Sequence, residues 1–158
     1  MDGSDDRQEP ESFIKNSQLL TELFGYWPDF HDAEILTLTL SVGCAQPWIP
    51  GCESPIMDMR VRLCDWNGKT ANTLIEMQFT RVQKIELSNF SYQNSESEVV
   101  FELQSRQFPD GRGGLSVPFD FICMEIFANC GVAGSLECEA VEVISASICS
   151  GVGSGNST

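Results

Sequence analysis

The spacing of hydrophobic residues changes once along the chain, near residue 35. Before that point, apolar residues recur every three or four positions, which is the period of a helix. They lie on one helical face and are Leu19, Leu20, Leu23 and Phe24. The pattern predicts a helix over residues 12–24, with Asn16 or Ser17 as its cap and Gly25 as its end.

Beyond residue 35 the apolar period falls to two, the spacing of a half-buried strand. Leu36, Leu38 and Leu40 alternate with threonines, and the alternation returns at residues 57–63, 75–79 and 99–103. Residues 119–127 are apolar at both parities. This predicts a central strand that is covered on both faces.

The last apolar segment changes parity within itself. Leu136, Cys138 and Ala140 share one parity, whereas Val141 and Val143 take the other. This predicts either a bulge near Ala140 or a strand buried on both sides. About seven strands behind one N-terminal helix, without βαβ alternation, indicate an α+β fold with a mostly antiparallel sheet.

One domain accounts for the chain length, because about 150 residues can bury a single core. We expect this domain to span residues 12–149. Residues 1–11 are acidic and residues 150–158 are rich in glycine and serine, so both ends are expected to be flexible.

The strong acidity of the chain narrows its partners. Twenty-three Asp and Glu against nine Lys and Arg give a net charge of −14. This charge repels nucleic acid and anionic membranes and suits a basic protein partner, although it could also serve solubility alone. The acidic start and the lack of an apolar run of about 20 residues predict a cytoplasmic protein.

Cysteine spacing gives no sign of a metal or redox site. The seven cysteines are odd in number and none forms a C-x-x-C pair, so we expect mostly reduced thiols and neither cofactor nor metal.

The one histidine, His31, lies beside Asp29, Asp32 and Glu34. In an extended chain Asp32 and Glu34 share one face while His31 points to the other, which argues against a joint catalytic site. We therefore predict no catalytic residue and a structural role for this segment, in which Asp29 or Asp32 binds backbone amides while aromatic rings pack beneath. The residues assigned to this role are Trp27, Pro28, Phe30, His31, Asp32 and Glu34.

Candidate partner contacts lie in loops and at a strand end, where side chains point outward. Trp48 and Glu53 belong to an irregular, proline-rich stretch at residues 43–55, and Glu96 and Glu98 precede the strand at 99–103. Trp48 could anchor a partner, or it could fold back on the domain.

Residues 16–35 carry a resemblance to a known family. The motif Phe-Gly-x-Trp-Pro-x-Phe-His-Asp-Ala-Glu at residues 24–34 resembles a bacterial family classed as immunity proteins of polymorphic toxin systems, numbered fifty in that series. Residues 60–63, 79–82, 87–94 and 136–145 are similar to its later strands, whereas residues 43–55 depart from it. The resemblance implies a cytosolic protein that binds and neutralises a cognate toxin, and the acidic composition suits a basic toxin such as a nuclease.

Two other functions stay open at this point. One is a small metal-dependent hydrolase that uses His31, Asp32 and Glu34 with remote carboxylates. The other is an acidic accessory binding domain without a toxin partner. The sequence leaves the oligomeric state open.

Overall fold

The fold is known from a computed structural model that describes residues 8–31, 33–44, 55–65, 73–89, 95–107 and 118–149. The flexible ends expected at residues 1–11 and 150–158 lie mostly or wholly outside these ranges. The described elements are a 3-10 helix Pro10–Ser12, α1 Gln18–Phe24, β1 Glu34–Cys44, β2 Pro55–Asp65, β3 Thr73–Ser88, β4 Ser95–Gln107, β5 Pro118–Cys130 and β6 Ala133–Ile148.

The predicted fold class is confirmed. The described chain is a mostly antiparallel sheet with one N-terminal α-helix, and its six strands come close to the expected seven. Among the described residues, no helix has both the length and the apolar character that crossing a membrane requires.

The predicted helix over residues 12–24 is wrong in its first half, because α1 begins only at Gln18. Lys15 instead pairs with β6: its amide donates to the carbonyl of Val141 at 3.0 Å, and its carbonyl accepts from the amide of Val143 at 2.9 Å. Asn16 then adopts a left-handed φ of 56°, which no helix continues. Residues before Gln18 are therefore not helical, because Lys15 forms hydrogen bonds with the edge of β6 instead.

The predicted end of α1 at Gly25 is confirmed, whereas the predicted N-cap makes no capping hydrogen bond. Ser17 occupies the N-cap position, but its hydroxyl donates to the carbonyl of Glu11 at 3.1 Å and makes no capping bond to the helix. Gly25 ends the helix as expected, since its φ of 83° is left-handed and therefore favours glycine.

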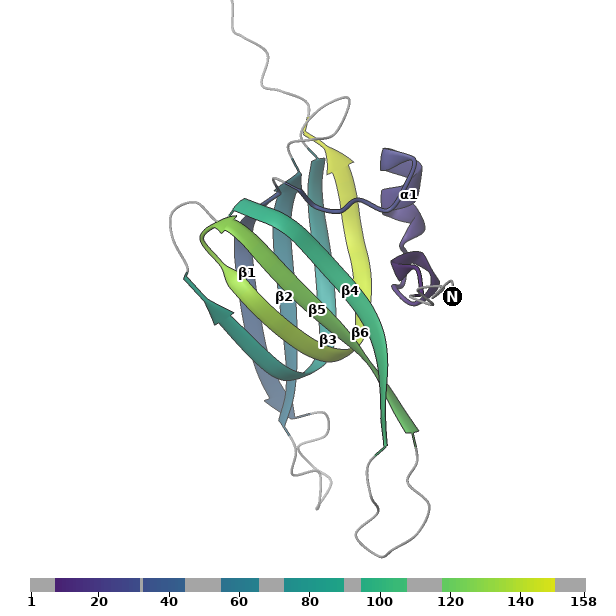
Figure 1. Cartoon of the computed structure of the whole chain (residues 1–158), viewed down its shortest axis with the longest axis vertical. Helices are drawn as coiled ribbons and strands as arrows, with labels where there is room; N and C mark the ends of the chain where they lie inside the picture. Colours follow the sequence, from purple (N-terminus) through teal and green to yellow (C-terminus); the bar gives the residue numbers. More distant parts are fainter. Residues whose placement is uncertain are drawn as a thin grey trace, which may run out of the picture.

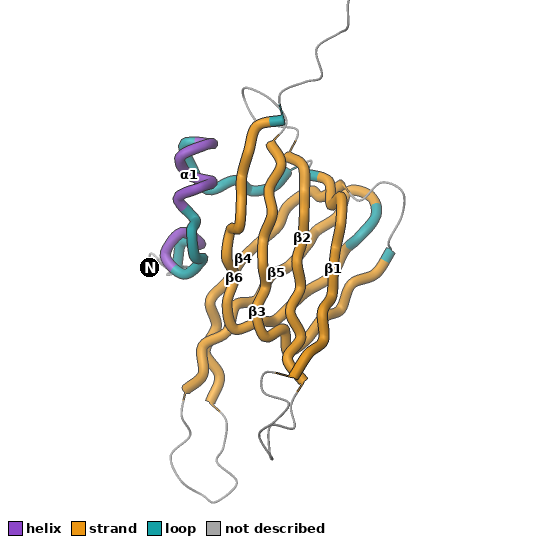
Figure 2. Tube along the Cα trace, turned by 180° about the vertical axis from the view of Figure 1, so that it is seen from behind, coloured by secondary structure: helices purple, strands orange, loops and turns teal. Residues whose placement is uncertain are grey.

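The strands follow the order β1-β2-β3-β6-β5-β4 and the sheet closes on itself through one pair, Glu34 of β1 with Ser95 of β4. Figure 1 shows two layers, with β4 and β5 crossing in front of β1 and β2. Figure 2 shows the same crossing from behind, with α1 and β1 on opposite sides of the sheet. We call these the β1–β2 layer and the β4–β5 layer.

The long strands β3 and β6 belong to both layers. Residues 73–79 of β3 pair with β2, whereas residues 134–138 of β6 pair with β5. β3 and β6 pair with each other from Thr73–Ile148 to Ser88–Ala133, so both strands bend together from one layer into the other (Figure 1).

The bend lies where the sequence changes parity. The buried positions of β6 switch parity between Cys138 and Val141, and those of β3 between Phe79 and Val82. Arg81, within the bend, has a left-handed φ of 52°. The predicted irregularity near Ala140 is therefore real, but it is a bend shared by two strands, and the register shifts lie on either side of it.

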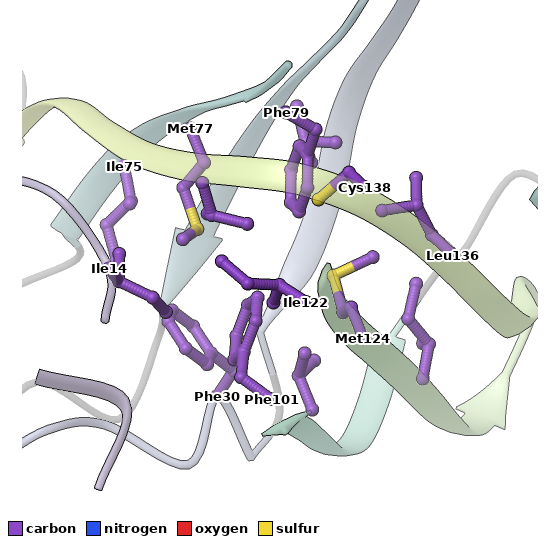
Figure 3. Packing of buried hydrophobic residues seen from close by; sticks show 14 of the residues in the cluster. Ile14, Phe30, Ile75, Met77, Phe79, Phe101, Ile122, Met124, Leu136 and Cys138 are labelled. Carbon is purple, nitrogen blue, oxygen red and sulfur yellow. The ribbon is translucent and has the colours of Figure 1, made fainter. Parts of the chain in front are cut away.

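The core fills the space between the two layers. Figure 3 shows Phe79 and Met77 of β3 facing Ile122 and Met124 of β5 across this space, with Phe30 below them. All five side chains are buried. The alternation seen in the sequence thus places one face of every strand in a common core.

Candidate protein-binding face

The aromatic residues of the Trp27–Glu34 segment pack against β4. The Trp27 ring lies edge-on to the rings of Phe30 and Phe101, with centroids 5.9 Å apart in both cases. Pro28 and Phe30 are buried, and Trp27 is partly so. Such edge-to-face contacts add to the stabilisation from burial. Phe30 and Phe101 belong to the hydrophobic core, and Trp27 packs against it.

Backbone hydrogen bonds shape the turn in the same segment. The Asp29 carboxylate accepts from the amide of His31 at 2.9 Å, and the Asp29 carbonyl accepts from the amide of Val99 in β4 at 3.1 Å. Phe30 takes a left-handed φ of 60°. Asp32 lies outside the described residues, His31 is exposed and Glu34 makes the closing pair to β4. The segment therefore joins the two layers.

The described residues hold no group of three or more His, Cys, Asp or Glu side chains that could bind a metal ion. The interior contains an apolar cavity of about 20 Å³, lined by residues that include Phe30, Leu38, Met77 and Leu87. This volume suits about one water molecule, so this cavity is far too small for an organic ligand.

The four candidate contact residues are only partly described. Trp48 and Glu53 lie outside the described residues, and so does the side chain of Glu96, although its backbone forms part of β4. Glu98 is exposed on the outward side of β4, where it pairs with Phe127 of β5. The outward side of the β4–β5 layer is therefore the surface to consider.

A row of polar residues crosses this surface. Glu102 of β4 pairs with Cys123 of β5, and Cys123 pairs with Glu137 of β6. Residues paired across antiparallel strands lie on the same face with Cβ atoms about 5 Å apart. Two carboxylates therefore flank one thiol.

Further along the strands, the same surface combines a third and a fourth carboxylate with an aromatic ring. Cys123, Glu125 and Phe127 are two positions apart along β5, so their side chains lie on the same face. Glu98 of β4 pairs with Phe127 on this face. Phe127 is 47% exposed. We call this surface the acidic face; its residues are Glu98, Glu102, Glu125, Phe127 and Glu137.

The exposed Phe127 corrects the prediction that β5 is covered on both faces. Ile122, Met124 and Ile126 point into the core, and Phe121 is buried on the outward side, but Phe127 on that side is not. The apolar residues at the second parity of β5 were the sequence signal for this surface. Apolar residues at the second parity of a strand fit a second buried face, but they fit equally well an apolar patch that faces solvent, as Phe127 does.

Arg106 contacts Glu137 and Phe121 at one end of the acidic face. Its guanidinium donates two hydrogen bonds to the Glu137 carboxylate, at 2.8 and 2.9 Å, and lies over the Phe121 ring at 4.3 Å from the centroid. The hydrogen bond with Glu137 raises the pKa of Arg106. A two-pronged pair of this kind holds both side chains in one geometry.

The pKa of the Cys123 thiol is affected by the carboxylates of the acidic face. Burial raises its pKa, and Glu125, Glu137 and Glu102 raise it further, while Arg106 has the opposite effect. Because nearby negative charge disfavours a thiolate, these carboxylates act together at one point.

No protein-family model, curated protein or solved structure matched the chain.

Proposed function

We propose that the protein is a cytoplasmic immunity protein that binds a basic toxin through the acidic face and thereby neutralises it. The observation that carries the proposal is that four carboxylates and the exposed Phe127 share one sheet surface, with Glu98 opposite Phe127 and Glu125 two positions from it. The resemblance of residues 16–35 to an immunity family supports the same function.

Charge and the aromatic ring have different tasks in this proposal. Carboxylates attract a basic partner over a distance and orient it, which raises the association rate more than the final affinity. Phe127 supplies apolar area that a partner can bury, and partly exposed aromatic rings are frequent anchors at interfaces. Arg106 and Glu137 fix one side of the surface before binding, which lowers the entropic cost of association.

The test is binding and rescue with the product of the gene immediately upstream, which this proposal expects to be a basic toxin. The double variant Glu98→Lys/Glu125→Lys reverses two charges on the acidic face. Glu22→Lys, on the exposed side of α1, makes the same kind of change elsewhere. We expect wild type and Glu22→Lys to co-purify with the toxin and to restore growth of cells that express it, and the double variant to do neither.

The association rate, measured by stopped flow, distinguishes long-range attraction by charge from the contacts made in the complex. The on-rate of wild type is expected to fall steeply as salt rises, because surface charges are screened beyond about 8 Å at physiological ionic strength. The double variant should associate slowly at all salt concentrations. Absence of a complex at micromolar concentrations would refute the immunity function. A complex that the double variant forms equally well would keep the function but reject the acidic face.

A further inference from the structure

In the described part of the chain, most of β1 has no strand along its outer side. β1 pairs with β2 along its whole length, but on its other side only Glu34 is paired, with Ser95. Within the described residues, no strand lies against β1 from Thr37 to Cys44. The edge of β6 is treated differently, because Lys15 forms a parallel bridge to Glu142 there.

The chemistry of this edge is unusual for an acidic protein. Residues 35–43 contain no ionisable side chain. Thr37, Thr39 and Ser41 are exposed on the outward side, while Leu40 and Val42, on the other side of β1, are 46% and 69% exposed. Proteins usually protect an edge strand with charges or proline, and an uncharged edge with apolar neighbours readily accepts another strand.

We propose that β1 pairs antiparallel with β1 of a second copy of this chain, so that two β1–β2 layers form one continuous sheet. A two-fold interface places each strand against a second copy of itself, so any charge near the axis would have a like charge close by. The absence of charges over residues 35–43 makes this strand suited to its own copy. A basic partner would find no carboxylate along residues 35–43.

The position of the acidic face agrees with this arrangement. The acidic face lies on the outward side of the other layer, whereas β2, next to β1, carries the exposed cations Arg60 and Arg62 on its outward side. Pairing through β1 therefore keeps the two acidic faces apart and leaves both open. The proposal does not depend on the immunity function.

The interface has a distinctive salt dependence. Each copy carries a net charge of −14, so the two copies repel at long range while the uncharged strands attract at contact. Salt screens the repulsion and leaves backbone hydrogen bonds intact. Dimer formation is therefore expected to strengthen with salt, which is the opposite of toxin association.

Sedimentation equilibrium of the full chain tests the proposal. The apparent mass should rise from 17.5 kDa towards twice that value between low micromolar and sub-millimolar concentrations. Thr39→Lys and Ser41→Lys each place one lysine on both paired strands, so that two like charges lie close together near the two-fold axis. Each variant is expected to weaken the dimer at least about tenfold. Gln18→Lys, on the opposite side of the molecule, should leave the dimer unchanged.

Amide hydrogen exchange locates the contact, since residues 37–43 should exchange more slowly in concentrated than in dilute protein. Circular dichroism shows whether each lysine variant is folded. If one of the two variants does not fold, the other still tests the interface. A chain that stays monomeric throughout the range would overturn the proposal. So would a dimer that neither edge variant weakens.

Discussion

The outward sides of the two layers differ in chemistry although they share β3 and β6. On the β4–β5 layer, the acidic face gathers carboxylates around Phe127. On the β1–β2 layer, the outward side chains of β1 and β2 that the structure describes are hydroxyls and cations: Thr37, Thr39, Ser41, Arg60 and Arg62. On the β1–β2 layer a carboxylate such as Glu76 lies beside Arg60 and Arg62, whereas Glu98 and Glu125 lie beside Phe127 on the acidic face.

Two arginines show the same contrast at the level of single contacts. Arg60 lies 3.1 Å from the Glu76 carboxylate and also donates to Gln78, and more than half of its side chain is exposed. Arg106 grips both oxygens of Glu137, whose side chain is only 13% exposed, and covers the Phe121 ring. The two arginine side chains are 54% and 49% exposed, so neither ion pair is expected to add much to stability. The difference is that Arg106 contacts a carboxylate and an aromatic ring at the same time.

The largest expected difference between the two outward sides is in stability. Phe121 is 1% exposed although it points away from the main core. Phe121→Ala is expected to lower the free energy of unfolding by about 3–4 kcal/mol, because it removes a buried ring. Thr39→Ala on the other side should change it by less than about 0.5 kcal/mol. Urea unfolding measures both, and equal values would remove the contrast between the surfaces.

The next effect concerns binding of the toxin. Phe127→Ala is expected to raise the dissociation rate about tenfold, as loss of an anchor at an interface does. Its association rate should stay near that of wild type, since no charge changes. Tyr26→Ala removes a similarly exposed ring next to α1 and serves as the control. If surface-plasmon measurements show both variants dissociating at the wild-type rate, Phe127 is not the anchor.

The smallest effect concerns the Cys123 thiol. Its pKa is raised, so the neutral thiol dominates at neutral pH and the reactive thiolate grows as pH rises. Glu125→Gln removes one negative neighbour, which lowers the pKa and should speed alkylation at fixed pH by a few-fold at most. Glu76→Gln on the other layer should not. Peptide mass spectrometry after iodoacetamide treatment assigns the rate to Cys123, and identical rates would show that Glu125 is too far away to act.

Much of the fold could be predicted because alternation is a local property. The apolar parity of residues 75–79 and 99–101 places those parts of β3 and β4 correctly against the core, whereas Leu103 is 36% exposed. The helix boundary could not be predicted in this way. Lys15 leaves the helical path to pair with Val141 and Val143, which are remote in sequence, so local periodicity held no sign of the contact.

The candidate surface was harder to predict than the fold. The sequence predicts that Glu96 and Glu98 precede a strand, which is wrong, because β4 begins at Ser95 and contains both. Glu98 is exposed because it lies on the outward side of this strand. The sequence pattern of β5 predicts a buried side for Phe127, the neighbour of Glu98, but an apolar residue at the second parity is equally consistent with a covered strand and with an exposed patch. Only the register of β4, β5 and β6 shows which side chains share that surface.

The shared bend of β3 and β6 also has a consequence for how the chain folds. The other extensive strand pairings join neighbours in sequence, but β3 must wait until β4 and β5 have been synthesised before it can meet β6. Such a distant contact is slow to close because of its loop entropy. Since neither layer is complete without it, intermediates with one finished layer should not accumulate, and fluorescence and circular dichroism should trace a single coincident unfolding transition.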